Sequence, residues 1–243
     1  MKPEDRATDV LAALHVRPLE RREEGRDQQQ MAAPHSLGAL PKIGETIWYV
    51  ATWRDEWVAQ LSLAAAGLKC GVRDTGIGGD FRAQYGRLNL IANNSRLLIL
   101  PDWHWPNVGS RVLALAERRI GADWQRRFGH PLLLLETVVD PSRFHGTVYR
   151  AANWIELGLT HGYRRTRDGY RPHAETPKRV FVRPLCRDAR ACLTHPDRDR
   201  LHLKGASKIM LHAARGLATT PPGDQSRALG HRTRARSPRL ERR

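Results

Sequence analysis

Residues 131–158 constrain the fold more than any other part of this sequence. The apolar run 132–135 is typical of a buried strand, and Glu136 follows it directly. A turn at Asp140–Pro141 comes next, and residues 147–157 have the spacing of a short helix. A carboxylate at the end of a buried strand is costly unless a partner compensates it. The segment therefore predicts the edge of a cleft.

Alternating apolar and polar residues before this segment predict two β-hairpins. The predicted strands are residues 45–52, 57–63, 87–92 and 96–100. Arg54–Asp55 forms the first turn, and Asn93–Asn94–Ser95 forms the second, because Asn tolerates the left-handed backbone of tight turns.

Helices are expected at residues 107–120, with Asn107 as N-cap, and at residues 122–128. A late strand is expected at residues 180–183. This order predicts an α+β fold, in which helices flank a mixed, mainly antiparallel sheet.

The composition divides the chain into three parts. Residues 1–34 carry charge runs with little periodicity and are expected to be a disordered or degenerate N-terminal segment, apart from a short helix considered at residues 9–15. Residues 35–195 hold the predicted strands and helices and form the α+β domain. Residues 196–243 are expected to be a basic, disordered tail.

The net charge of +16 is unevenly distributed along the chain. Residues 161–243 contain 21 of the 41 Lys and Arg residues but only 7 of the 25 Asp and Glu residues. Such asymmetry favours DNA or another polyanion as a partner. The alternative is a solubilising tail without a specific partner.

The basic loop at residues 164–179 is the best nucleic-acid candidate, because it places guanidinium groups beside an aromatic ring. Its candidate residues are Arg164, Arg165, Arg167, Tyr170, Arg171, Lys178 and Arg179. A solvated hairpin loop explains the same composition. Arg96 is a further candidate, since turn chemistry does not explain it, and it could meet Glu136 or a phosphate.

Glu136 is the first candidate for a catalytic group, as a general base or as an organiser of donors. The alternative is a carboxylate paired with an arginine for structural reasons. Tyr149 and Asn153, four residues apart on the expected helix, share a face and could orient a ligand or clamp a neighbouring strand.

Trp103 and Trp105 flank His104 and could stack on bases, although tryptophan is also a common loop anchor. The eleven histidines and three cysteines form no recognisable metal motif, so no metal is expected. The sequence predicts neither a membrane span nor a signal peptide, and a cytoplasmic protein is expected.

Several ordered runs resemble the DruA family of the Druantia anti-phage systems, which is also met as a module associated with insertion-sequence transposases. The matching runs are 44–46, 64–69, Arg73–Asp74, 93–101, 106–113, 134–137 and 144–158. This resemblance implies a role in phage defence or mobile-element biology, with defence-system or transposase proteins as partners. It implies no particular reaction, so whether the protein is an enzyme stays open, and a non-catalytic subunit of a multiprotein complex is an alternative.

The chain also departs from this family and is expected to be a divergent or truncated member. Relatives carry Trp-Ile-Gly-Trp where this sequence has Gly76-Ile77-Gly78-Gly79. The order of elements looks similar to the GNAT acyltransferase fold, which suggests a transferase as an alternative function. The segment 105–111 has one glycine and a proline instead of the usual acyl-CoA-binding pattern, so no cofactor is assigned.

Overall fold

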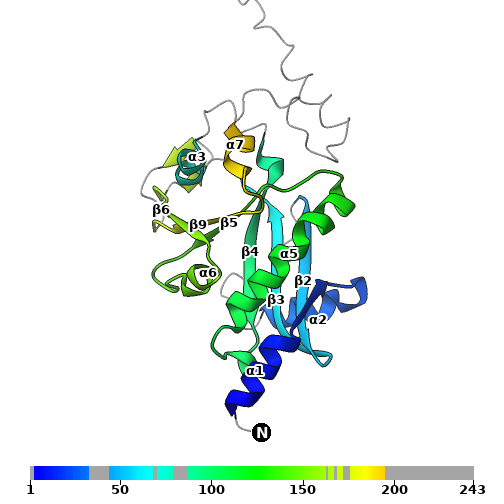
Figure 1. The fold of residues 1–243 in the computed structure, drawn as a ribbon. Helices are drawn as coiled ribbons and strands as arrows, with labels where there is room; N and C mark the ends of the chain where they lie inside the picture. The colour runs from blue at the N-terminus through cyan, green and yellow to red at the C-terminus, as the bar shows by residue number, and fades with distance from the viewer. Residues whose placement is uncertain are drawn as a thin grey trace, which may run out of the picture. The chain divides into compact units, whose positions relative to one another are not determined.

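A seven-stranded sheet is the central element of the computed structural model (Figure 1), and its strand order is β1-β2-β3-β4-β5-β9-β6. Only β4 and β5 run parallel; the other neighbouring pairs are antiparallel. Helices flank this sheet, which confirms the predicted α+β class. The structure describes residues 3–32, 44–67, 70–78, 87–162, 164–166, 169–171 and 176–194.

The N-terminal segment belongs to the fold. It forms α1 (Pro3–Ala13), β1 (His15–Pro18), the 3-10 helix η1 (Arg21–Glu23) and α2 (Glu24–Ala32). β1 pairs with β2 at one edge of the sheet. The expectation of disorder is therefore wrong for residues 3–32, because contacts with the sheet compensate for weak periodicity. The expected tail, residues 196–243, lies outside the described residues.

The first predicted hairpin is confirmed by β2 (Thr46–Trp53) and β3 (Glu56–Ala65). Arg54 and Asp55 form its turn with φ values of 48° and 68°. Positive φ at both central residues matches the right-handed twist of the two strands.

The second predicted hairpin is wrong. Residues 91–99 form one strand, β4 (Ile91–Ile99), preceded by the 3-10 helix η2 (Leu88–Leu90). The register with β3 shifts between Ser62 and Leu63, so β4 carries a bulge at Ser95. The polar residues that suggest a turn form this bulge instead, and the chain continues in the same direction.

One long helix, α5 (Val108–Phe128), replaces the two expected helices. Gly121 lies within it, and a Cβ there would have open space around it. Asn107 lies at the predicted N-cap position with φ +67°, but its side chain makes no capping hydrogen bond, and Gly129 ends the helix with φ +79°. Upstream of α5 lie α3 (Gly71–Ile77) and the 3-10 helix η3 (Pro101–Trp103).

The expected helix at residues 147–157 is wrong in its second half. α6 (Thr147–Ala151) is a helix of only five residues. Asn153 then adopts φ +60°, and the chain continues as β6 (Ile155–Leu159). The remaining sheet strands are β5 (Leu134–Val139) and β9 (Arg179–Pro184), and β9 confirms the predicted late strand. α7 (Ala189–Thr194) follows β9.

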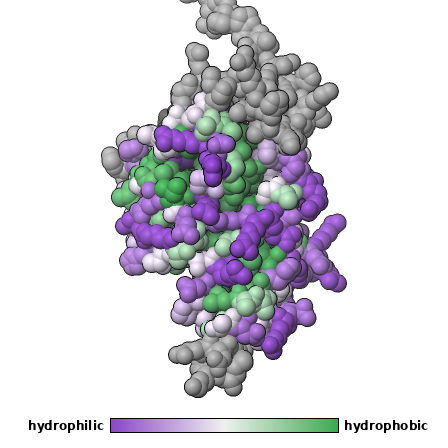
Figure 2. Space-filling view, in the orientation of Figure 1, coloured by the Kyte–Doolittle hydropathy of each residue, from purple (hydrophilic) through white to green (hydrophobic). Residues whose placement is uncertain are grey.

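The two faces of the sheet carry different cores. α5 covers one face (Figure 1), and the apolar cluster beneath it includes Leu61, Trp124, Leu135 and Phe181. The second cluster lies on the opposite face, where Leu134 and Val182 pack with Leu193 of α7. Hydrophilic side chains occupy much of the outer surface in Figure 2.

Two short strands outside the main sheet, β7 (Arg164–Thr166) and β8 (Gly169–Arg171), pair antiparallel as a ribbon. They lie between β6 and β9 in the chain, where the basic loop is predicted. Within the described part of the chain, none of the helices has the length and apolar character needed to cross a membrane.

Candidate functional site

The parallel strands β4 and β5 pair over a short distance and then separate. Their register covers Ile91 with Leu134, Ala92 with Leu135, and Asn93 with Glu136. Beyond these pairs, β4 continues to pair with β3, and β5 continues to pair with β9. Parallel strands that separate at their carboxyl ends leave an opening in a sheet, which is a common place for ligands. The side chains at this point therefore define the candidate site.

On the α5 face, three polar side chains fill the start of this opening. The Tyr149 hydroxyl donates to Asn94 Oδ1 at 2.8 Å, and Thr137 Oγ1 donates to the Asn94 carbonyl at 3.0 Å. The Tyr149 ring stacks on Phe181 with 5.6 Å between ring centroids. Burial raises the pKa of Tyr149 to about 12, so the phenol stays neutral and acts as a donor at neutral pH.

The Asn94 amide also holds the bulge of β4 in place. Its Nδ2 donates to the carbonyls of Ser62, at 3.0 Å, and Arg96, at 2.8 Å. A bulge interrupts regular pairing between strands, and these bonds supply donors for carbonyls on both strands. Asn94 therefore joins the bulge to the Tyr149 hydroxyl.

On the opposite face, Glu136 forms a buried ion pair with Arg73 of α3. Arg73 Nη1 lies 3.1 Å from both carboxylate oxygens, and Arg73 Nε donates to Asp74 Oδ1 at 2.9 Å. Arg73 is 0% and Glu136 3% exposed. Burial raises the pKa of Glu136, an effect that the Arg73 charge opposes and the Asp74 charge reinforces.

This geometry changes the predicted site. Glu136 is the third residue of β5 and not its end, because the strand continues to Val139. Its neighbour Thr137 contacts Tyr149, and successive side chains of a strand point to opposite faces. Glu136 and Tyr149 therefore lie on different faces of the sheet. The interpretation of Glu136 as a carboxylate paired with an arginine matches its position.

A cavity of about 600 Å³ lies beside the separated part of β4. It is bordered by the end of β4, the start of α5 and one side of α6. The lining residues are Leu97, Leu98, Ile99, Pro101, His104, Trp105, Asn107, Gly109, Ser110, Arg143, Phe144, Thr147, Val148 and Ala151. An apolar wall with a few polar groups at this volume suits a small molecule.

The start of α5 packs tightly against α6 at this cavity. A Cβ on Gly109 would lie 2.6 Å from Val148 Cγ2, so only glycine fits this contact without movement. Ser110 Oγ donates to the Asn107 carbonyl at 3.1 Å. The positive end of the dipole of a 21-residue helix thus borders the cavity.

The other predicted catalytic residue, Asn153, is exposed in the turn between α6 and β6. Its carbonyl accepts a bond of 3.1 Å from Arg183 Nη1. Asn153 does not share a helix face with Tyr149, because α6 ends at Ala151. The cavity lining includes neither of these two residues nor Glu136.

The predicted nucleic-acid residues fall into separate places. Arg96 is 6% exposed, its Nη1 donates to the Ser95 carbonyl at 2.7 Å, and burial lowers its pKa. Four others lie on the β7–β8 ribbon, where Arg164 is paired with Arg171 and Arg165 with Tyr170. Lys178 and Arg179 lie at the start of β9, and Arg167 is outside the described residues.

The tryptophans of η3 and the loop after it anchor that loop. Trp103 is 5% exposed and packs edge-on against Trp53, with 5.7 Å between ring centroids. Trp105 packs against Trp103 at 5.4 Å and lines the cavity. Because its ring is buried, Trp103 fits the interpretation as a loop anchor better than that of a side chain that stacks on bases.

Sequence reasoning missed Arg73 and most of the cavity lining. Arg73 and Glu136 are 63 residues apart, and α3 is too short to show a helical period. The sequence signal for Arg73 was the Arg73–Asp74 dipeptide, which is one of the runs that resemble the DruA family. Across the described ranges, no group of three or more His, Cys, Asp or Glu side chains is arranged to hold a metal ion.

Together these features define an α+β protein with an open, mainly antiparallel sheet and a cavity where its one parallel strand pair separates. The family model for Druantia protein DruA matches residues 10–167 of the sequence. The chain therefore belongs to the DruA family. No curated protein is significantly similar to the sequence.

Several solved acetyltransferases are similar to this chain in structure. The aminoglycoside acetyltransferase AAC(6')-Ib, crystallised with coenzyme A, has a TM-score of 0.48 at 13% identity, with 72% of this chain and 96% of that chain covered. The ribosomal-protein-S18-alanine N-acetyltransferase from Escherichia coli has a TM-score of 0.45 at 14% identity, covering 71% and 94%. The spermidine N-acetyltransferase from Vibrio cholerae reaches 0.46 at 8% identity, covering 72% and 96%.

Proposed function

We propose that this DruA-family protein acts in anti-phage defence by binding DNA through the β7–β8 ribbon, together with other proteins of its defence system. Family membership supports the biological role. The observation that carries DNA binding is the position of the ribbon. It connects β6 to β9 outside the main sheet and brings Arg164, Arg165 and Arg171 into one short element.

Phosphate contacts supply most of the affinity of non-specific DNA binding, and they make it dependent on salt. A two-stranded ribbon that carries arginines and one tyrosine can contact phosphates and stack on an exposed base. Lys178 directly precedes β9 and Arg179 is its first residue, so the basic sequence continues from the ribbon into the main sheet.

The test is a fluorescence-anisotropy titration of labelled single- and double-stranded DNA with the full chain at several salt concentrations. In the ribbon variant, Arg164, Arg165, Arg167 and Arg171 are changed to Ala. In the control variant, four arginines elsewhere are changed: Arg21, Arg22, Arg118 and Arg127. We expect the ribbon variant to lose more affinity and more of the salt slope than the control. Equal losses of affinity and salt slope in the two variants would show that DNA binding depends only on the net charge of the protein.

The cavity favours a second candidate, a transferase that binds a small molecule beside β4. Its volume of about 600 Å³ and apolar lining are the specific observations. Thermal unfolding of the full chain with millimolar acetyl-CoA tests cavity binding, and Ala151→Trp, which fills the cavity, is the control. Stabilisation that Ala151→Trp removes would support binding, and an unchanged melting temperature would count against it.

Catalysis by Glu136, Tyr149 and Asn153 is a separate question in this second candidate. Glu136 is buried and paired with Arg73, so a substrate would have to reach this ion pair before Glu136 could accept a proton from it. A turnover assay on Glu136→Gln therefore tests the chemistry, and the thermal experiment tests only the ligand.

A further inference from the structure

Glu156 on β6 is shared by two arginines from different elements. Its Oε2 lies 2.6 Å from Arg150 Nη2, and its Oε1 lies 2.6 Å from Arg179 Nη1. The side chains of Arg150, Glu156 and Arg179 are 44%, 28% and 36% exposed. A dissolved anion can therefore reach both guanidinium groups if the carboxylate leaves.

The two arginines are held by the fold as well as by Glu156. Arg150 Nη1 donates to the His145 carbonyl at 2.6 Å, and its guanidinium lies 5.4 Å from the centre of the Phe181 ring. Arg179 is the first residue of β9 and pairs with Leu159 of β6. Because one carboxylate already bridges both side chains, their spacing suits a single anion with two or more oxygens.

We propose that Arg150 and Arg179 bind one phosphate group of DNA, and that Glu156 occupies this phosphate site while no DNA is bound. This inference rests on the proposed DNA-binding function and adds residues to its surface. Guanidinium groups bind phosphate and carboxylate oxygens with similar geometry, so the same pair can exchange one for the other.

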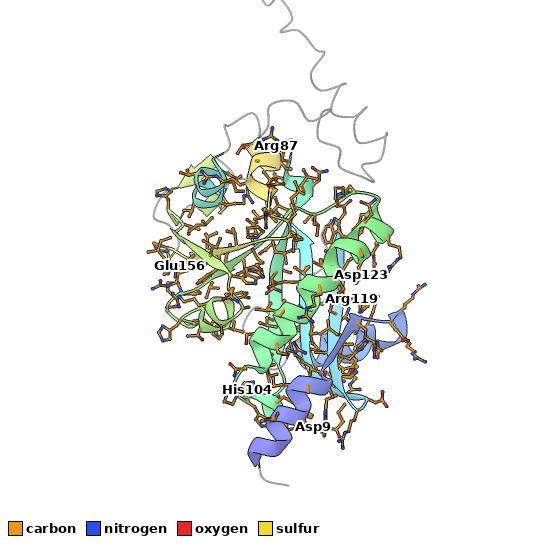
Figure 3. All side chains as sticks on the ribbon, in the orientation of Figure 1. Asp9, Arg87, His104, Arg119, Asp123 and Glu156 are labelled. Carbon is orange, nitrogen blue, oxygen red and sulfur yellow. The ribbon has the colours of Figure 1, made fainter. Side chains whose placement is uncertain are left out.

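The surroundings favour phosphate over another carboxylate. The three groups carry a net charge of +1 with Glu156 in place, and the β7–β8 ribbon connects the two strands that supply Glu156 and Arg179. Glu156 lies at the β6 edge of the sheet, away from Arg119 and Asp123 on α5 (Figure 3). A phosphate bound here therefore adjoins the strand ends from which the ribbon extends.

The test compares Glu156→Gln with wild type in the full chain, by fluorescence anisotropy on labelled duplex DNA at several salt concentrations. Glu156 competes with phosphate as an exposed ion pair, so its removal should raise affinity roughly twofold to fivefold. Glu156→Gln keeps the same phosphate contact as wild type, so its slope of log K against log salt should change little, whereas removal of both arginines should make the slope shallower by about 0.9. Inorganic phosphate, added as a competitor, should weaken Glu156→Gln binding more than sodium chloride of equal ionic strength.

Glu20→Gln is the matched control, because Glu20 forms an exposed pair with Arg22 at 2.7 Å, beside the opposite edge strand β1. The triple variant with Arg150→Ala and Arg179→Ala added to Glu156→Gln should lose the gain. Circular dichroism should show the same folded signal for all variants.

Equal affinity for Glu156→Gln and Glu20→Gln would overturn the inference, and if the ribbon variant still loses binding, the proposed function stands. A gain in Glu156→Gln that survives in the triple variant would also overturn it. If no variant and no wild-type protein binds DNA, both the inference and the proposed function fail.

Discussion

At the scale of single residues, close contacts decide which substitutions the site tolerates. Gly146 precedes α6 with φ +73°, and a Cβ there would lie 2.5 Å from Cζ of the fully buried Phe181. Phe181 in turn stacks on Tyr149. Gly146 therefore supports the position of the Tyr149 hydroxyl without touching it.

Gly146→Ala should destabilise the protein by about 2–4 kcal/mol, from left-handed backbone strain together with displacement of the Phe181 ring. Urea unfolding measures this loss. Gly129→Ala is the matched control, because Gly129 has φ +79° and open space around a Cβ. Its loss should be only about 1 kcal/mol, from the left-handed backbone alone. Equal losses in the two variants would mean that the Phe181 contact contributes nothing.

Arg73→Met should cost about 3–5 kcal/mol at neutral pH, because it leaves Glu136 buried without its counter-charge. Glu136→Gln should cost less, since Arg73 keeps Asp74 as a partner. The raised pKa of Glu136 favours folding below the carboxyl's unfolded pKa, and this contribution is lost as pH rises through the folded value. The cost of Arg73→Met should therefore shrink as pH falls.

Chemical unfolding of both variants between about pH 4 and pH 8 checks this asymmetry. A loss in Arg73→Met that stays constant with pH would show that Glu136 is not the group left uncompensated.

At the scale of elements, the sequence predicted the regular parts of the fold and missed the irregular ones. β2, β3 and β9 follow their alternating residues closely. The helix predicted at 147–157 ends early because Asn153 takes a left-handed conformation, a choice that local propensity does not determine. The sequence of the bulge in β4 is also typical of a turn. The pairing of Ser62 with Arg96 identifies a bulge, because β4 stays paired with β3 on both sides of Ser95.

Gly76 belongs to the run Gly76–Gly79, where a departure from the family is expected. A Cβ there would lie 2.7 Å from Leu157 Cδ1, so a side chain from β6 already occupies the space beside α3. Gly79 lies outside the described residues.

The contact between α5 and α6 gives a prediction at this scale. Gly109→Ala should cost about 1–3 kcal/mol, because Val148 is β-branched and adjusts poorly. In a Val148→Ala background the same change should be nearly neutral. Gly121→Ala, in the interior of α5 with open space around a Cβ, should instead stabilise by about 0.5–1 kcal/mol. Thermal unfolding of wild type, Gly109→Ala, Val148→Ala and the double variant provides a double-mutant cycle. Additive effects of the two substitutions on the free energy of unfolding would contradict the contact.

At the scale of the whole molecule, one sheet separates two apolar clusters. Leu134 packs in the cluster with α7, and its neighbour Leu135 packs beneath α5. Both clusters depend on β5, so the described part of the chain should unfold as one cooperative unit.

Leu134→Ala and Leu135→Ala should each cost about 2–5 kcal/mol. Because the clusters share β5, far-ultraviolet circular dichroism and tryptophan fluorescence should report the same urea midpoint in each variant. Separate midpoints in Leu134→Ala would mean that the α7 side unfolds independently.

The alternation along β5 also restricts how the gene can change. Glu136 and Thr137 occupy opposite faces, one beside Arg73 and the other beside Tyr149. An insertion of one codon between Leu134 and Leu135 would exchange the faces of the strand residues after it, moving the Glu136 carboxylate beneath α5 and Leu135 towards Arg73. A substitution in β5 therefore changes the contacts of one residue, whereas a change in its length changes the contacts of several residues at once.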